Sequence, residues 1–183
     1  MPNLVSFIRL LLVPVFLYLL IGLDEVAVAG ALVFLIGATD WVDGYLARRL
    51  NQVSELGKAL DPLADRLMII AALIGGLIAG VVPAVIVIPL LARELVVGVA
   101  AILLASRTGR RLEVRFRGKA ATFLIYGAVA SFYLAAAGVA PWLFTPPAWM
   151  CGVIGLVLYW DVAFIYLKDV AAGLSSVESP VPQ

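Results

Sequence analysis

The sequence predicts an all-α, polytopic membrane protein with six transmembrane helices and a short N-terminal interfacial segment. Hydrophobic residues make up 64% of the 183 residues and charged residues 14%, whereas soluble domains have about 45–50% apolar and about 25% charged residues. A soluble fold with this composition would have too few charged groups to cover its surface. In addition, the Lys and Arg residues gather in alternate connections between long apolar stretches. Together these observations favour a chain that lies almost entirely within a bilayer.

Each predicted span is an apolar stretch close to the roughly 20 residues that cross a bilayer as a helix. The stretches fall at about 10–23, 26–46, 60–80, 81–105, 120–140 and 147–167. Residues 1–170 therefore form one membrane domain, and the polar, Pro-containing tail 171–183 is predicted to be disordered.

The distribution of positive charge predicts the orientation of the chain in the membrane. All 13 Lys and Arg residues can be placed on one side, and the first, third and fifth connections contain none of them. Short connections rich in Lys and Arg stay in the cytoplasm. Both termini are therefore predicted to be cytoplasmic, in a cell inner or plasma membrane.

Two absences narrow the chemistry. The sequence has no His and a single Cys, Cys151. These counts exclude His-based acid–base catalysis, phosphohistidine intermediates, His-containing zinc sites and an intrachain disulfide. No G-x-x-x-x-G-K-[ST] loop is present, which argues against a P-loop ATPase. No nucleic-acid partner is expected.

Four aspartates interrupt the second and third apolar stretches. Asp40 and Asp43 are three residues apart and Asp61 and Asp65 are four apart, so each pair shares one helix face. In an antiparallel hairpin that turns near residues 51–52, Asp40 is level with Asp65 and Asp43 with Asp61. A membrane-embedded Asp costs about 2.5–3.5 kcal/mol on insertion scales. The alternative to a functional site is a solvated hairpin end that carries a few surface acids.

The carboxylates predict a site for divalent cations. Oxygen-only ligands favour Mg²⁺ or Mn²⁺ over zinc, and four carboxylates in a small space suit two ions better than one. Gly44 and Ala47 leave the same helix face without bulk, and Arg48 offers a planar fork for a phosphate. Gly57 allows close approach of the next helix, which plain helix packing also explains.

The sequence around these aspartates resembles a known family. Residues 40–65 contain D-W-V-D-G-Y-L-A-R, eight further residues, and G-K-A-L-D-P-L-A-D. This pattern is similar, without a departure, to the signature of the CDP-alcohol phosphotransferases, D-x2-D-G-x2-A-R-x8-G-x3-D-x3-D. The resemblance extends over roughly residues 2–167. It includes the segment from Pro2 to Arg9, which resembles the family's short N-terminal interfacial segment. It also includes the A-R-E at 92–94 and the G-K-A at 118–120.

The resemblance implies a six-helix fold, usually a homodimer, with an active site open to the cytoplasm. The donor would be a CDP-linked lipid, most often CDP-diacylglycerol, and the acceptor an alcohol hydroxyl, with CMP as the leaving group. The metal ligands that it implies are Asp40, Asp43, Asp61 and Asp65. Asp65 also matches the general base. The residues that match donor-binding positions are Asn3, Gly44, Ala47, Arg48, Ser54 and Gly57.

The acceptor is expected to be glycerol 3-phosphate, because positive side chains accompany the predicted site. Arg93 and Glu94 lie within an apolar stretch, where they form either an internal ion pair or, through Arg93, a phosphate site. Arg117 and Lys119, at the start of the fifth span, are expected to face the same pocket. Phosphatidylglycerol, which would give cardiolipin, and inositol phosphate are the alternative acceptors.

Two other classes of membrane protein also use intramembrane acids. Membrane prenyltransferases hold a diphosphate through Mg²⁺ and aspartates, but their two Asp motifs are far apart, whereas here both lie within 26 residues. A cation carrier would often show internal repeats, and this sequence shows none. Both classes are weaker interpretations than a phosphatidyltransferase.

Overall fold

The structure is a computed structural model that describes the backbone of residues 2–36, 55–108 and 116–178. The described part of the chain is built from helices, as the sequence predicts. They are α1 (Pro2–Leu17), the π-helical segment η1 (Tyr18–Gly22), a helix over Val26–Ile36, α3 (Glu55–Ile78), α4 (Ala84–Thr108), α5 (Phe116–Ala136) and α6 (Pro141–Glu178).

Several of these helices are long and apolar enough to cross a membrane. Among the described residues, three segments meet both requirements, namely Ala84–Arg107, Arg117–Ala136 and Pro141–Ala171. Shorter apolar helices cover Phe7–Gly22, Val26–Ile36 and Arg66–Ile78. The all-α membrane fold class is therefore confirmed. That the chain crosses the membrane six times stays a prediction.

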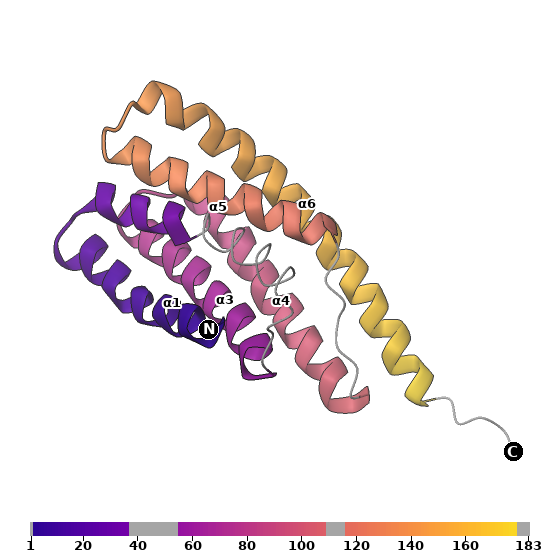
Figure 1. The fold of residues 1–183 in the computed structure, drawn as a ribbon. Coiled ribbons are helices and arrows are strands. Elements are labelled where there is room, and N and C mark those ends of the chain that lie inside the picture. Colours follow the sequence, from indigo (N-terminus) through magenta and orange to yellow (C-terminus); the bar gives the residue numbers. More distant parts are fainter. Residues whose placement is uncertain (1, 37–54, 109–115, 179–183) are drawn as a thin grey trace, which may run out of the picture.

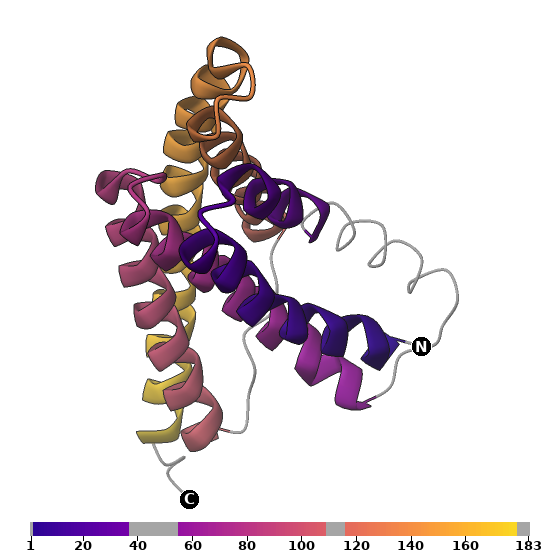
Figure 2. The same cartoon turned by 90° about the vertical axis from the view of Figure 1, so that its left-hand side faces the viewer.

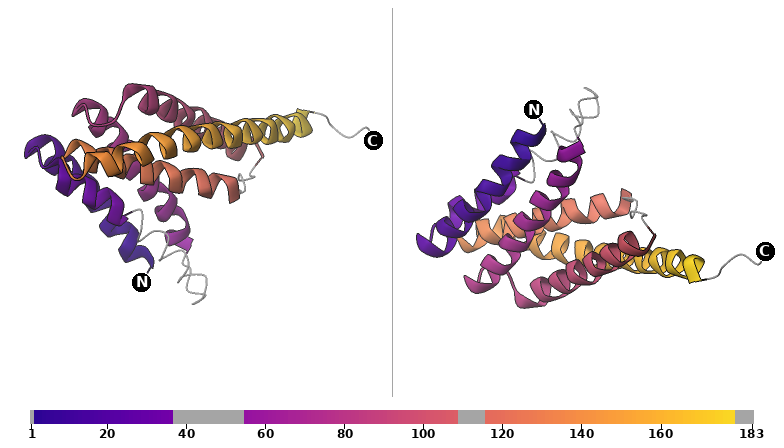
Figure 3. Two further views of the ribbon diagram at one scale, coloured as in Figure 1. Left: turned by 90° about the horizontal axis from the view of Figure 1, so that it is seen from above. Right: turned by 90° about the horizontal axis from the view of Figure 1, so that it is seen from below.

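The helices form two groups that cross one another. In one group α1 packs along α3, and in the other α5 and α6 form a hairpin while α4 runs beside the second half of α6 (Figure 1). Figure 2 shows that α1 and α3 diverge from the long direction of α4 and α6. The views from above and below agree, and they place the first residues of α1 and α3 at the same end of the molecule (Figure 3).

The apolar core lies where the two groups meet. Phe16 of α1, Met68 of α3 and Tyr133 of α5 are fully buried there. The Phe16 and Tyr133 rings meet edge to face with their centroids 5.8 Å apart. The Tyr133 hydroxyl donates a hydrogen bond of 2.8 Å to the carbonyl oxygen of Ala72. This bond satisfies a hydroxyl that would otherwise be costly to bury, and it fixes α5 against α3.

Two helices extend beyond the predicted apolar stretches. The segment predicted to be interfacial, residues 2–9, is continuous with the first apolar stretch in α1. Pro2 suits the first turn of a helix, and the next helix-disfavouring residue is Pro14. At the other end α6 continues to Glu178, although the tail was predicted to be disordered from residue 171. The first residue there that strongly opposes a helix is Pro180. The domain boundary at residue 170 stays a prediction.

The close contact at Gly30 predicts a strong effect on stability. A Cβ atom at this position would lie 2.6 Å from the Cβ of Tyr133. We expect Gly30→Ala to destabilise the fold by about 1–3 kcal/mol, because the helix must move away from α5. The measurement is thermal unfolding of the detergent-solubilised protein, followed by circular dichroism.

Gly98→Ala is the matched control, since a Cβ at this helical glycine meets no heavy atom within 4 Å among the described residues. Alanine there should be neutral or stabilise by up to about 1 kcal/mol. Equal losses from the two substitutions would contradict the close contact at Gly30.

Candidate active site

The structure describes the backbone of one half of the predicted acidic site, the half on α3. Asp61 and Asp65 lie on α3 and are one helical turn apart, so the helical spacing assumed for them is confirmed. The other half of the signature lies outside the described residues, namely Asp40, Asp43, Gly44, Ala47, Arg48 and Ser54. Within the described ranges no group of three or more His, Cys, Asp or Glu side chains could hold a metal ion. The metal site thus stays a prediction that needs both halves.

The backbone brings together two elements that the sequence assigns to the donor site. Asn3 lies in the first turn of α1 and Gly57 in the first turn of α3. The two helices pack on each other and begin at the same end of the molecule (Figure 3). This arrangement puts the N-terminal segment beside the helix that carries Asp61 and Asp65.

A network of polar contacts surrounds Glu94 of α4. Its Oε2 accepts a hydrogen bond of 2.8 Å from Nη1 of Arg66 on α3. Its Oε1 accepts one of 2.9 Å from Nη1 of Arg93 and another from the hydroxyl of Tyr159 on α6. A single carboxylate therefore links α3, α4 and α6. We call Arg66, Arg93, Glu94 and Tyr159 the Glu94 cluster.

Arg93 is enclosed by this cluster. The residue is 3% exposed, its Nε donates to the Tyr159 carbonyl oxygen at 3.4 Å, and its guanidinium carbon lies 3.7 Å from the centre of the Tyr159 ring. A buried charge is tolerated when it is paired and hydrogen-bonded. The internal ion pair with Glu94, one of the two interpretations of the sequence, is present in the structure.

Arg66 differs from Arg93 in its exposure. The Arg66 side chain is 49% exposed, whereas that of Glu94 is 7% exposed. Arg66 directly follows Asp65 on α3. The Glu94 cluster thus begins inside the bundle and ends at the half-exposed Arg66 side chain, next to Asp65 in the chain.

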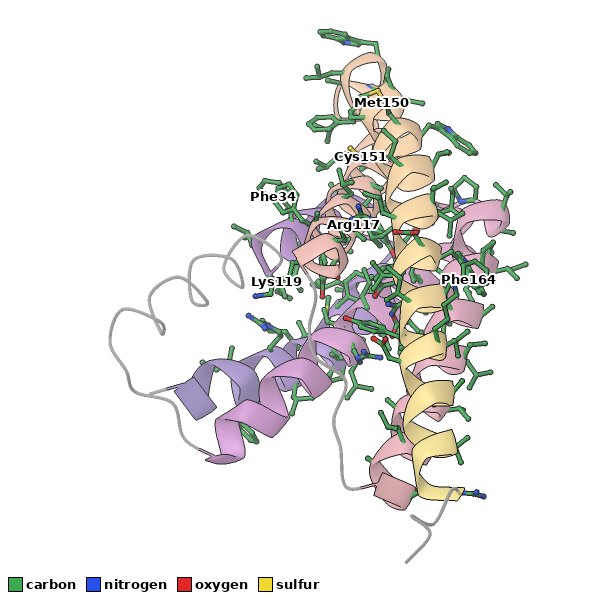
Figure 4. All side chains as sticks on the ribbon, turned by 90° about the vertical axis from the view of Figure 1, so that its right-hand side faces the viewer. Phe34, Arg117, Lys119, Met150, Cys151 and Phe164 are labelled. Atoms are coloured by element: carbon green, nitrogen blue, oxygen red, sulfur yellow. The ribbon has the colours of Figure 1, made fainter. Side chains whose placement is uncertain are left out.

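The other two predicted acceptor-binding residues lie at the start of α5. Arg117 pairs with Asp161 of α6 at 3.2 Å, and the side chains are 69% and 46% exposed, respectively. Lys119 is also exposed, and it projects to the side of α5 away from α6 (Figure 4). Residues two apart on a helix do not share a face. The side chains of Arg117 and Lys119 therefore leave α5 in different directions. That both face one pocket with Arg93 stays a prediction.

Two members of the Glu94 cluster were not among the predicted site residues. Arg66 appeared in the sequence only as one of several positive charges near the second connection, and Tyr159 lies inside an apolar stretch. The available signal was Glu94 itself. A carboxylate within a membrane helix requires donors, and its partners had to come from neighbouring helices.

Curated relatives match the chain over different lengths. A relative from Mycobacterium tuberculosis is 41% identical over 122 residues, which cover 67% of this chain and 58% of the relative. The chain thus spans less than two thirds of that relative's length. The cardiolipin synthase (CMP-forming) of Streptomyces coelicolor is 36% identical over 175 residues, covering 92% of this chain and 81% of the relative.

The chain is also similar to a relative whose name contains glycerol 3-phosphate. The CDP-diacylglycerol–glycerol-3-phosphate 3-phosphatidyltransferase of Bacillus subtilis is 37% identical over 148 residues, covering 73% of this chain and 76% of the relative. The model of the CDP-alcohol phosphatidyltransferase family matches residues 1–172. Because this match covers nearly the whole chain and agrees with the signature on residues 40–65, the protein belongs to the CDP-alcohol phosphatidyltransferase family.

Proposed function

We propose that the protein transfers a phosphatidyl group from CDP-diacylglycerol to glycerol 3-phosphate and releases CMP. The observation that carries this proposal is the complete signature from Asp40 to Asp65 in a chain that matches the family over residues 1–172. The similarity to the Bacillus subtilis glycerol-3-phosphate phosphatidyltransferase supports the choice of acceptor. The product would be phosphatidylglycerophosphate, a lipid of the same membrane.

Mg²⁺, with Mn²⁺ as a substitute, is the proposed cofactor. The family is generally dependent on a divalent metal, and an oxygen-only donor set suits these hard cations. Asp61 and Asp65, one turn apart on α3, fit one side of such a site, and we assign the other side to Asp40 and Asp43. Two ions bound there would offset the negative charge of a diphosphate.

The chain's own residues would bind the substrates and move one proton. We assign the general base to Asp65, which takes the proton of the acceptor hydroxyl as the oxygen attacks phosphorus. A phosphorus–oxygen bond forms to the acceptor while the bond to CMP breaks. Asn3, Gly44, Ala47, Arg48, Ser54 and Gly57 would surround the donor. The sequence has no His, and none of the specified positions of the signature from Asp40 to Asp65 is a Ser or Cys that could serve as a nucleophile. This favours direct displacement.

The acceptor proposal also depends on positive charge. Arg117 and Lys119 are exposed at the start of α5 and are assigned to the acceptor phosphate, together with Arg93. Because Arg93 is buried and paired with Glu94, a direct contact would require its guanidinium to exchange Glu94 for the phosphate. A neutral alcohol would gain little from these cations.

A second candidate function is cardiolipin synthesis with phosphatidylglycerol as acceptor. The similarity to the Streptomyces coelicolor cardiolipin synthase favours it, because that match covers 92% of the chain. Phosphatidylglycerol is also an anionic phosphodiester, so the charge of the site is compatible with either acceptor. For both reactions we propose a homodimer in a cell inner or plasma membrane, with the site and both termini facing the cytoplasm.

The acceptor is tested by direct competition. Purified protein receives labelled CDP-diacylglycerol and Mg²⁺ with glycerol 3-phosphate, phosphatidylglycerol or inositol phosphate in parallel, and CMP and labelled lipid are quantified. We expect the fastest CMP release with glycerol 3-phosphate. Cardiolipin as the main product would instead establish the second candidate. A protein that releases no CMP with any alcohol would be incompatible with both functions.

A further inference from the structure

The Glu94 cluster carries an excess of positive charge. It contains the guanidinium groups of Arg66 and Arg93 and the one carboxylate of Glu94, within hydrogen-bond distance of one another. Among these four described side chains, one carboxylate balances one guanidinium. Since Arg93 is buried and Glu94 nearly so, and an unbalanced charge is costly in such a place, the excess charge resides at the half-exposed Arg66.

We propose that Arg66 is a substrate-binding residue, which Glu94 positions, and that it binds the phosphate group of the acceptor. This inference rests on the proposed function. A guanidinium has five N–H donors in a rigid fork, and its bond to Glu94 occupies one of them at 2.8 Å. Such a fork can bind a phosphate through paired, charge-assisted hydrogen bonds. With 49% of its side chain exposed, Arg66 can be reached by a ligand.

The place of Arg66 on α3 favours the acceptor over the donor. Asp65, proposed to accept the proton of the acceptor hydroxyl, is its neighbour in the chain. The two positions are adjacent on α3. In this proposal one small molecule bridges them, with its hydroxyl at Asp65 and its phosphate at Arg66.

Two of the cations assigned above to the acceptor phosphate, Arg93 and Arg117, are held differently from Arg66. The guanidinium of Arg93 is enclosed by Glu94 and Tyr159 and is 3% exposed as a residue. Arg117 is paired with Asp161 at 3.2 Å. Arg66 combines an accessible side chain with a fixed anchor. Holding the side chain in place before the ligand arrives reduces the entropy that binding would cost.

Glu94 is a positioning residue in this proposal, because it acts on the substrate through Arg66. Tyr159 donates to the same oxygen of Glu94, Oε1, as Arg93 does. These two bonds hold the carboxylate so that its other oxygen, Oε2, accepts from Arg66. Replacing Glu94 by Gln would keep the size of the side chain and remove its charge. The Arg66 side chain would then lose its charged anchor.

The test separates the two substrates kinetically in the full-length protein with CDP-diacylglycerol and Mg²⁺. We expect Arg66→Gln to raise the KM for glycerol 3-phosphate about 10-fold to 100-fold, the range for losing a charged hydrogen-bonding group. The KM for CDP-diacylglycerol should change by less than about twofold. Arg66→Lys, which keeps the charge without the fork, should give an intermediate KM, and Glu94→Gln should shift the same KM. Unphosphorylated glycerol, as a poor acceptor, should react equally with wild type and Arg66→Gln.

Arg107→Gln is the matched control, since Arg107 is an exposed arginine in the last turn of α4. This variant should leave both KM values and the melting temperature unchanged.

An unchanged KM for glycerol 3-phosphate in Arg66→Gln overturns the inference. A rise confined to the KM for CDP-diacylglycerol also overturns it, because that result would assign Arg66 to the donor. If Arg66→Gln releases no CMP, the test is the rise in melting temperature that glycerol 3-phosphate causes. A rise equal to that of wild type overturns the inference, and loss of the rise supports it. A wild-type protein that is inactive with glycerol 3-phosphate contradicts the proposed function itself.

Discussion

Asp65→Asn is expected to abolish CMP release with every acceptor. Asparagine has nearly the same shape as aspartate, but it cannot accept the proton of the attacking hydroxyl. Loss of a general base alone typically costs about 10²–10⁴ in rate, and loss of one carboxylate ligand adds to this cost through the weakened metal site. The measurement is CMP release from CDP-diacylglycerol at saturating glycerol 3-phosphate, phosphatidylglycerol and inositol phosphate.

The loss should be chemical, with the fold intact. Glu25→Gln provides the control, because it removes one carboxylate charge at an exposed position between η1 and the helix over Val26–Ile36. Both variants should melt at the wild-type temperature, and only Asp65→Asn should lose activity. A rate for Asp65→Asn within about tenfold of wild type would mean that another group takes the proton.

The sequence predicts the fold class and the helix of the site well because both depend on local patterns. Spacing along one segment is enough to place Asp61 and Asp65 on one face, and α3 has the helical geometry that this prediction requires. The family resemblance also depends on local spacing within residues 40–65, and the family match over residues 1–172 confirms it.

The contacts of the Glu94 cluster could not be predicted from local sequence patterns. Its hydrogen bonds join residues 28 and 65 positions apart in the chain. The sequence left two interpretations of Arg93 open, because an ion pair and a ligand site require the same residue type. The choice depends on which neighbouring helix supplies further donors, and Tyr159 on α6 lies inside an apolar stretch. Arg66 was hidden among the positive charges that orient the chain in the membrane.

Helix ends were harder to predict than helix interiors for a related reason. Apolar content marks where a chain can be buried, whereas a helix continues until a residue opposes it or its end is capped. α1 therefore begins before the first apolar stretch, and α6 continues beyond the last one. Apolar content alone therefore does not mark where either helix begins or ends.

Removal of divalent metal is expected to have an effect as large as that of Asp65→Asn. With EDTA in excess, four carboxylates and an anionic diphosphate would repel one another, and no group would offset the charge that develops on the departing CMP. We expect CMP release to stop and to return on addition of Mg²⁺ or Mn²⁺. Ca²⁺ should restore less activity, because it prefers more ligands at longer distances than Mg²⁺.

The same experiment distinguishes a catalytic from a structural metal. The described core of α1, α3 and α5 is held by apolar packing and by the bond from Tyr133 to Ala72, so the melting temperature should fall little when EDTA is added. Donor binding should weaken at the same time, because the diphosphate loses its link to the carboxylates. Full activity in EDTA would contradict the metal site and would leave Asp40, Asp43 and Asp61 without the function that their matched spacing indicates.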